Sequence, residues 1–311
     1  MDLQNQTELT EFILLGFSAL EDIQNLLSGG FLIIYLLTLL WNTFIISIAI
    51  LDKKLRTPMY FFLGNLSFLD ICYTTTTVPQ MLYHLLSGRN TISYMGCVFQ
   101  LYLFFSFLGV ECLLLAVMAF DRYIAICRPL RYTLIISNNI CLQLASACWA
   151  GGFLNSLIHA VCAFRLPFCG NNQIDINHFF CEEPAVLQLA CMDTYMVKIT
   201  IFALSVIVLM LPFTFIVVSY IHIARVVLSI QSMEGRKRAF STCFTHLTVV
   251  ILFYSTISFT YLQPQSDWAA DQEKKASVFY ALVSPMLNPI IYSLRNKDVK
   301  RALAKVMGKI S

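Results

Sequence analysis

The chain has 311 residues, of which 58% are hydrophobic and only 13% are charged. A soluble domain carries about a quarter charged residues, so this composition excludes an ordinary water-soluble protein and indicates a polytopic membrane protein. The formal net charge is only +3. We interpret this charge as a consequence of membrane topology, and we do not expect a nucleic-acid partner.

Seven apolar segments divide the chain, and each is long enough to cross a hydrocarbon core of about 30 Å as a helix. Helices satisfy their backbone polar groups within one segment, as lipid requires. A β-barrel would need short segments of alternating polarity, which the sequence lacks. We therefore predict an all-α membrane protein with a seven-transmembrane helix bundle. The segments are 23–51, 58–86, 93–120, 138–162, 195–224, 239–263 and 276–294.

The lysines and arginines indicate which side of the membrane each loop faces. Of the 21 basic residues, most fall on the side that holds Arg122. The exceptions are Arg89, Arg165, Lys198, Lys274 and Lys275. Because basic loops stay in the cytosol, we expect a multi-pass plasma-membrane protein. It would have an extracellular tail at residues 1–22, a helix bundle at 23–294 and a cytosolic tail at 295–311.

Two Asn-X-Ser/Thr sequons occur near the start of the chain. Asn5-Gln-Thr lies in the predicted extracellular tail and is an accessible N-glycosylation acceptor. Asn65-Leu-Ser lies inside an apolar segment, so we do not expect it to be modified. Asn42, a polar residue in the first segment, is expected to form a hydrogen bond between helices.

Two carboxylic acids fall well inside apolar segments, Asp70 in the second and Glu111 in the third. A carboxylate in hydrocarbon must be neutral, paired or hydrated. The two acids can share a proton, bind a cation or form hydrogen bonds with a polar neighbour such as Asn288. We expect either a static structural role or movement of a proton or ion between two states of the protein.

Four of the 11 cysteines fall on the predicted extracellular side. This compartment is oxidising, so disulfides are expected, and four cysteines allow three pairings among which spacing does not choose. They are Cys97, Cys169, Cys181 and Cys191. No cysteine–histidine spacing makes a convincing zinc site, although His178 is close to Cys181, so we predict no metal.

The connection between the fourth and fifth segments, residues 163–194, is long and acidic. A loop of this length is uncommon unless it is functional, and we expect a lid or binding loop. Glu182 and Glu183 belong to it, and we expect both to lie on its solvated surface.

The cytosolic end of the bundle contains an adjacent pair of charges, Asp121 and Arg122. Such a pair is costly inside a membrane and indicates a functional switch. In the last segment, Pro285 and Pro289 each remove a helix hydrogen bond, which predicts a hinge. Apolar residues at helical spacing between basic ones in 295–310 predict a short amphipathic helix on the inner leaflet.

These motifs resemble those of the odorant receptors, a branch of the class A G-protein-coupled receptors, over practically the whole chain. Two departures are Trp41 before Asn42, where that family usually has glycine, and Phe244, where it usually has serine or alanine. The resemblance is carried by Leu55–Leu63, Met118–Tyr132, Ser219-Tyr220, Lys237–Cys243 with His246-Leu247, and Pro285–Asn296.

The resemblance implies specific roles for these residues. Cys97 would pair with Cys181, and Cys169 with Cys191, holding the long loop over a ligand pocket. Arg122 would be held by Asp121 at rest and released when the sixth segment swings outward, and Glu111 would partner Asp70. The activation switch would comprise Asp121, Arg122, Tyr123, Tyr220, His246, Asn288, Pro289 and Tyr292.

A volatile odorant has few polar atoms, so we expect apolar burial to provide most of its affinity, at about 25 cal/mol per Å². Phe104 occupies the position where similar receptors for amines hold an aspartate, which disfavours amine ligands. Helical turns counted inward from Cys97, and along the later segments, give the candidate ligand-binding residues. These are Phe104, Phe105, Leu108, Gly109, Cys112, Ser205, Val208, Tyr254, Ile257, Ser258, Tyr261, Val278 and Ala281.

We therefore predict an odorant receptor that binds a small, mostly apolar molecule in the outer half of the bundle and raises cyclic AMP. Its partners would be the odorant, a stimulatory heterotrimeric G protein, the bilayer and accessory trafficking proteins. A transporter or a non-olfactory chemosensory receptor is the alternative, although no internal repeat of the kind typical of transporters is seen. A retinal protein would need a lysine in 276–294, where none occurs. We predict no cofactor and no enzymatic activity.

Overall fold

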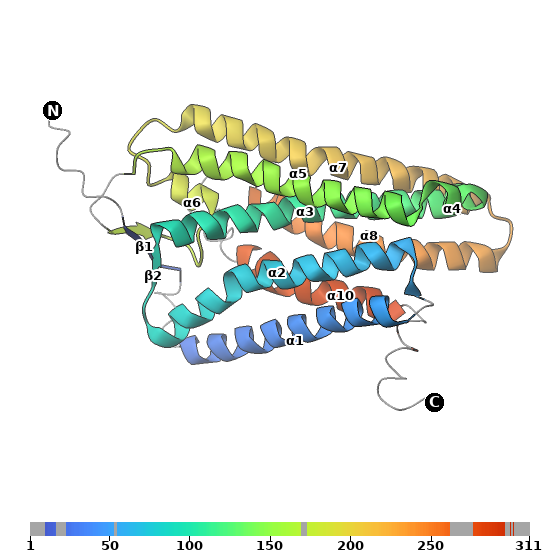
Figure 1. Cartoon of the computed structure of the whole chain (residues 1–311), viewed down its shortest axis with the longest axis horizontal. Coiled ribbons are helices and arrows are strands. Elements are labelled where there is room, and N and C mark those ends of the chain that lie inside the picture. The colour runs from blue at the N-terminus through green and yellow to red at the C-terminus, as the bar shows by residue number, and fades with distance from the viewer. Residues whose placement is uncertain are drawn as a thin grey trace.

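The computed structural model describes residues 10–16, 23–52, 55–168, 173–261 and 276–295, together with 299 and 301. Long helices run side by side through most of this part of the chain (Figure 1). They are α1 (Gln24–Leu51), α2 (Pro58–Ser87), α3 (Tyr94–Cys127), α5 (Asn138–Phe164), α7 (Tyr195–Ser229) and α8 (Met233–Tyr261). The last helical segment begins at residue 276 and contains a π-helical turn, Phe279–Val283, followed by α10 (Ser284–Arg295).

The prediction of a seven-helix membrane bundle is confirmed. Six helical segments are long and apolar enough to cross a membrane. The seventh, α2, has 30 residues but is less apolar because it contains Asn65, Asp70 and the run Thr74–Thr77. The outer faces of the bundle expose large apolar side chains, such as Leu26 on α1 and Leu211 on α7, which is the expected surface for contact with lipid tails.

Helix α3 is the central element, and it packs against α2, α5, α7 and α8. It continues beyond residue 120, where the predicted apolar segment ends, to Cys127. Asp121 and Arg122 therefore lie on the helix itself. A short 3-10 turn (Pro129–Arg131) and α4 (Tyr132–Ile135) follow before α5 begins.

Two glycines allow α3 and α5 to approach closely. A Cβ atom built on Gly152 of α5 would lie 2.5 Å from Val110 Cγ2 and 2.6 Å from the Ser106 carbonyl oxygen. A Cβ atom on Gly109 would lie 3.2 Å from Gly152 Cα. Small residues at helix contacts let backbones approach in membrane proteins, and here they bring α5 next to the middle of α3.

A three-stranded sheet covers one end of the bundle, which we call the sheet end. It consists of β1 (Glu11–Leu14), β2 (Thr91–Ser93) and β3 (Gln173–Ile176). The central strand β1 pairs antiparallel with β2 and parallel with β3. Phe12 is fully buried and packs against Phe168 with ring centroids 5.9 Å apart.

The sheet was not predicted, because residues 1–22 were interpreted as a simple tail. Its strands come from the N-terminal region, the α2–α3 connection and the long α5–α7 connection. Three consecutive apolar residues, 12–14, give Glu11–Leu14 no alternation of polarity in the sequence, and the alternating burial of Phe12 and Leu14 is seen only in the structure. The amphipathic helix predicted at residues 295–311 lies almost entirely outside the described residues and stays a prediction.

Candidate functional site

The long loop between α5 and α7 is fastened over the sheet end of the bundle. A disulfide joins Cys97 at the start of α3 to Cys181 in the loop. The Gln100 side chain accepts a hydrogen bond of 2.9 Å from the Cys181 backbone N–H and donates one of 2.8 Å to Gln80. The Cys97–Cys181 pairing is the one that the family resemblance implied. Cys191 is also disulfide-bonded, and its expected partner, Cys169, lies outside the described residues.

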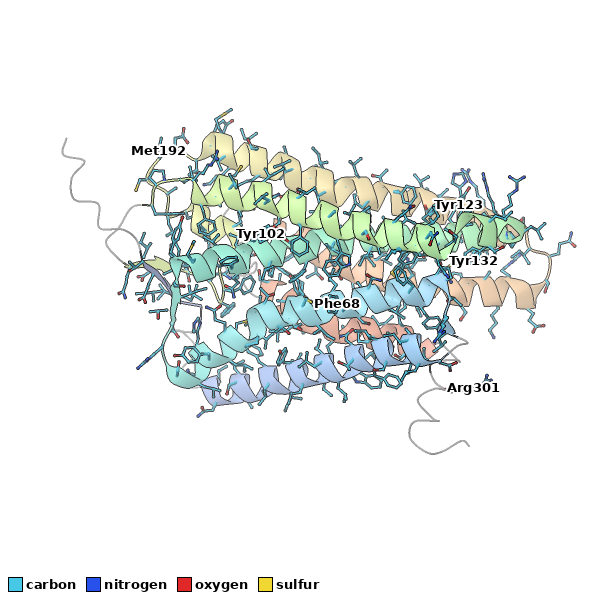
Figure 2. All side chains as sticks on the ribbon, viewed as in Figure 1. Phe68, Tyr102, Tyr123, Tyr132, Met192 and Arg301 are labelled. Carbon is cyan, nitrogen blue, oxygen red and sulfur yellow. A yellow bond between two sulfur atoms is a disulfide. The ribbon has the colours of Figure 1, made fainter. Side chains whose placement is uncertain are left out.

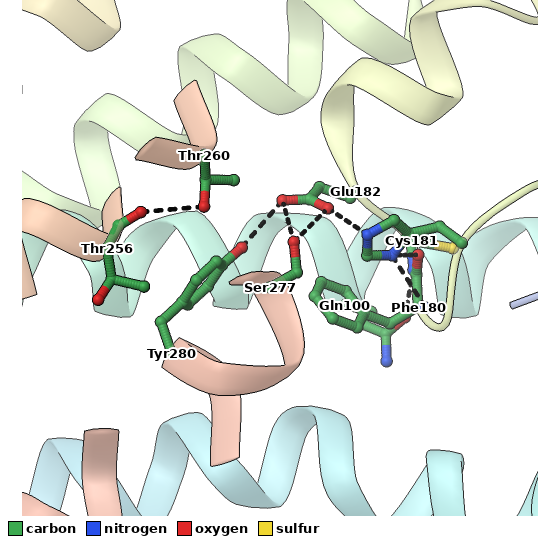
Figure 3. Close-up of polar contacts among 9 residues, drawn as sticks. Gln100, Phe180, Cys181, Glu182, Thr256, Thr260, Ser277 and Tyr280 are labelled. Carbon is green, nitrogen blue, oxygen red and sulfur yellow. Dashed lines mark hydrogen bonds and ion pairs between the residues drawn. The ribbon is translucent and has the colours of Figure 1, made fainter. Parts of the chain in front are cut away.

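Glu182 is buried, so the prediction of a solvated side chain was wrong. Its carboxylate accepts hydrogen bonds from Tyr280 Oη at 2.9 Å and from Ser277 Oγ at 3.1 Å (Figure 3). His178 Nε2 lies 2.6 Å from Glu182 Oε2. The adjacent disulfide draws the loop inward, and a buried carboxylate is stable only with such donors around it. Glu182 thus ties the loop to the last helical segment.

Glu183, the first residue of the short helix α6 (Glu183–Leu187), is also buried, and its prediction as a surface residue was wrong as well. Both of its carboxylate oxygens lie within hydrogen-bonding distance of His159 Nδ1 on α5, at 3.0 and 3.1 Å. The His159 ring stacks on Phe105 of α3, with centroids 5.4 Å apart and planes inclined by 10°. Glu183 therefore fixes a histidine that lies between α3 and α5.

A small cavity of about 20 Å³ lies below this loop, between α3, α5 and α7. A cavity of this size holds about one water molecule. It brings together six predicted ligand-binding residues and three that were not predicted, of which two come from α5. Its lining consists of Phe105, Leu108, Gly109, Cys112, Asn155, His159, Ser205, Val208 and Leu209.

Sequence reasoning missed the contribution of α5 because it counted helical turns on the other segments only. The available signal was His159, an ionisable side chain inside an apolar segment, which in a membrane protein indicates a functional position.

The other predicted ligand-binding residues whose side chains the structure describes do not line this cavity. Phe104 is fully buried and packs with Tyr73, Phe180 and Tyr280, at centroid distances of 5.0 to 5.7 Å. Tyr254 is buried against Phe213. Ile257 and Ala281 are buried, and Ser258 and Val278 are partly buried. The side chain of Tyr261 lies outside the described residues.

A second polar cluster lies deeper in the bundle, where α2, α3 and α10 meet. Asn288 Nδ2 lies 3.1 Å from one oxygen of Asp70 and 3.5 Å from an oxygen of Glu111. Both acids are buried. One amide nitrogen thus bridges two carboxyl groups in an apolar interior. A proton or a cation between the acids would relieve the repulsion between them.

At the end of the bundle opposite the sheet, Arg122 is held by the neighbouring carboxylate. Arg122 Nη2 lies 2.5 Å from Asp121 Oδ2, and Nε donates to the same oxygen at 3.0 Å. Tyr132 Oη, from α4, donates to the other oxygen of Asp121 at 2.7 Å. Burial, with this hydrogen bond, raises the pKa of Tyr132 above its usual value, which keeps the phenol protonated as a donor.

The predicted tyrosines and histidine of the switch lie on the helices around Arg122. Tyr220 Oη of α7 lies 2.7 Å from His246 Nδ1 of α8. His246 Nε2 lies 3.1 Å from the Leu115 carbonyl oxygen of α3. Because the carbonyl only accepts, Nε2 carries the proton and Nδ1 accepts from Tyr220. These contacts join three helices through one imidazole.

Two further residues of the predicted switch lie close by. Tyr123 packs its ring against His222. Tyr292 of α10 is buried, and its hydroxyl has no hydrogen-bond partner within the described part of the chain.

Comparison of the sequence with known proteins places this chain in one family. A family model described as olfactory receptor matches residues 31–309. The chain belongs to the olfactory receptor family. It is 51% identical over 311 residues to human (Homo sapiens) olfactory receptor 2G3, with complete coverage of both chains. It is 48% identical to human olfactory receptor 2W1, covering 99% of this chain and 95% of the relative. It is also 48% identical to the olfactory receptor-like protein OLF3 of Canis lupus familiaris, covering 100% and 98%.

Membership in the olfactory receptor family establishes the kind of activity. The protein is a multi-pass membrane receptor for odorants, it signals through a heterotrimeric G protein to cyclic AMP, and it is not an enzyme. The transporter reading has no support from these relatives.

Proposed function

We propose that this olfactory receptor binds a small, mostly apolar odorant in the cavity between α3, α5 and α7. The observation that supports the proposal is the lining of this cavity, which joins apolar side chains from α3 and α7. Phe105, Leu108, Val208 and Leu209 provide an apolar lining, and the disulfide-fastened loop lies over the sheet end. Ligand sites are typically apolar, with a few polar groups that set orientation. Ser205 is one such group.

An odorant has a larger volume than one water molecule, so the cavity of about 20 Å³ must enlarge when the odorant binds. We propose that the enlarged pocket extends toward α8 and the last helical segment. The remaining ligand candidates would then contact the odorant: Phe104, Tyr254, Ile257, Ser258, Tyr261, Val278 and Ala281. A conformation that exists before binding and has more space would be selected by the ligand.

The signalling step in this proposal is the release of Arg122. Odorant binding would favour an outward position of α8, in which His246 separates from Tyr220 and Arg122 leaves Asp121 to meet the G protein. Tyr220 and Tyr292 would help to hold this second arrangement, with Tyr123, Asn288 and Pro289 as the other members of the switch, and a proton or cation would move at Asp70 and Glu111. To shift such an equilibrium from 1:99 to 99:1 requires about 5.5 kcal/mol of differential affinity, so a small apolar ligand should act with micromolar potency.

We also propose an orientation with the N-terminus and the sheet end outside the cell and residues 295–311 in the cytosol as an amphipathic helix. The basic residues near Arg122 support this orientation, because positive loops remain cytosolic. Asn5 would then be glycosylated, and Cys169 would pair with Cys191. Accessory trafficking proteins would assist delivery to the plasma membrane, and the G protein would be of the stimulatory, olfactory type.

The pocket proposal is tested by filling the cavity. We expect Ser205→Phe to reduce the potency of agonists from a diverse odorant panel at least about tenfold in a cell-based cyclic AMP assay, because the cavity has no space for a ring beside the ligand. Ile199→Phe is the matched control, since Ile199 is 45% exposed on the outer face of the same helix. Unchanged potency of Ser205→Phe, at equal surface expression, would refute the pocket.

The switch proposal has a separate test. Arg122→Ala should abolish the odorant-stimulated rise in cyclic AMP while surface expression, measured by antibody labelling of an N-terminal tag, is retained. An undiminished odorant response would contradict the role of Arg122.

A further inference from the structure

We infer that His159 Nε2 is the hydrogen-bond acceptor that orients the ligand, and that the receptor therefore prefers odorants bearing a hydroxyl group, namely alcohols and phenols. The inference rests on the proposed odorant pocket and adds to it the chemical class of the ligand. Two of the residues that line the cavity have ionisable side chains, His159 and Cys112. His159 is 1% exposed.

The hydrogen-bonding state of the His159 ring follows from its partners. Nδ1 faces both oxygens of Glu183, at 3.0 and 3.1 Å. An ionised carboxylate only accepts hydrogen bonds, so the proton of a neutral imidazole must be on Nδ1. The other ring nitrogen then carries a lone pair and can only accept. Glu183 thus acts as a positioning residue that selects the tautomer.

The second nitrogen of the ring has no hydrogen-bond partner. His159 Nε2 is buried, and it contacts no donor or acceptor in the described part of the chain. A buried polar atom left in this state costs free energy, and most such atoms are satisfied in folded proteins. The stacking on Phe105 holds the ring in place, so Nε2 cannot turn toward another partner without breaking two contacts.

His159 lines the cavity and brings to it a buried acceptor with no partner in the described part of the chain, which indicates what the ligand must provide. An alcohol or phenol donates its hydroxyl proton to Nε2, and its hydrocarbon part fits against Phe105, Leu108 and Val208. An ether or a ketone of the same size has no proton to donate and leaves Nε2 unsatisfied. A site built to bond a hydroxyl group rejects analogues that lack it far more strongly than it rejects a missing methylene group.

The test uses pairs of isomers that differ in the hydroxyl proton. Octanol is compared with heptyl methyl ether, and para-ethylphenol with para-methylanisole, together with similar branched pairs, in a cyclic AMP assay on the full-length receptor. We expect the wild type to respond to alcohols or phenols at concentrations about tenfold lower than to the isomeric ethers, since one net hydrogen bond corresponds to about this factor. A wild-type receptor that prefers ethers, or that responds to no hydroxyl compound in the panel, overturns the inference.

Two substitutions separate a ligand contact from a structural role. In His159→Asn, the amide nitrogen replaces Nδ1 and keeps the bond to Glu183, but no atom replaces Nε2. We expect normal surface expression and a ratio of alcohol to ether potency near one. In His159→Gln, the amide group reaches the Nε2 position, and part of the preference for alcohols over ethers should remain. A wild-type ratio in His159→Asn would show that the histidine is only structural and would overturn the inference.

Glu183→Gln tests the choice of tautomer. The side-chain amide that this substitution introduces can donate a hydrogen bond to Nδ1 of His159, so the ring proton can be on Nε2. Nε2 can then donate a hydrogen bond to an ether oxygen. We therefore expect the potency of ethers to rise relative to that of alcohols, and an unchanged ratio would count against the positioning role of Glu183.

Ser205→Phe distinguishes a failure of the proposed pocket from a failure of the inferred preference for hydroxyl compounds. If it abolishes responses while His159→Asn keeps the wild-type ratio, the pocket stands and the inference falls. If Ser205→Phe has no effect, the proposed pocket itself falls.

Discussion

Buried carboxyl groups lie at both ends of the bundle and in its middle. They differ in the number of hydrogen-bond donors around them. Glu182 at the sheet end is surrounded by Ser277, Tyr280 and His178. Asp121 at the other end receives both Arg122 and Tyr132. In the middle, Asp70 and Glu111 share the amide of Asn288.

This difference indicates different tasks. A carboxylate with donors on both oxygens is stable as an anion and holds neighbouring elements together. Two carboxyl groups with one shared donor are not both stable as anions in an apolar interior. We therefore expect the end clusters to hold neighbouring elements together in this arrangement, and we propose that the middle pair changes its charge when the helices move. Four substitutions, in three experiments, test this comparison.

The largest effect is expected from Glu182→Ala. Removal of this carboxylate leaves the hydroxyls of Ser277 and Tyr280 without their acceptor and detaches the loop from the last helical segment. We expect the free energy of unfolding to fall by roughly 3 kcal/mol, seen as a large loss of surface expression and of thermal stability in detergent. Wild-type stability of Glu182→Ala would show that the Glu182 cluster does not hold the loop on the last helical segment.

A matched pair of amide substitutions sharpens the comparison. Asp70→Asn removes one of two repelling acids and adds a donor for Glu111, so stability should change by less than about 1 kcal/mol. Glu182→Gln places an NH2 group against donors and should cost more than that. The measurement is the midpoint of thermal unfolding of both purified variants. Equal losses would mean that the two carboxylate sites do not differ.

A smaller effect than that of Glu182→Ala is expected from Tyr132→Phe, which takes one donor from Asp121. The loss of this bond should weaken the restraint on Arg122 by about 1 kcal/mol and raise cyclic AMP in the absence of odorant several-fold. Basal signalling is compared at equal surface expression, with Tyr195→Phe as the control, because Tyr195 is 64% exposed at the sheet end. A basal level equal to that of the control would exclude Tyr132 from the restraint.

The helix bundle could be predicted from the sequence because hydrophobic length and basic loops report directly on membrane crossing. The Asp121–Arg122 pair was also predictable, since adjacent charges at the end of an apolar segment have few other partners. In contrast, Glu182 and Glu183 were misplaced because their burial depends on donors that are distant in the sequence, such as Tyr280 and His159. Composition around a loop does not reveal which distant helix will supply a hydroxyl or an imidazole.

The cavity was predicted in part for a similar reason. The residues on α3 and α7 follow from helical periodicity, so Phe105, Leu108 and Ser205 could be chosen by counting turns. The involvement of α5 depends on the Gly109–Gly152 contact, which is a property of two helices together. No pattern within one segment contains this information.

The placement of β1 between β2 and β3 has a practical consequence for biosynthesis. The first strand to leave the ribosome cannot complete its pairing until β3, which follows α5, has been delivered to the same face of the membrane. A deletion of residues from Glu11 onward would therefore remove the central strand β1, and β2 and β3 would lose their pairing partner. Epitope tags for this receptor should accordingly be placed ahead of Thr10 and should leave Glu11–Leu14 intact.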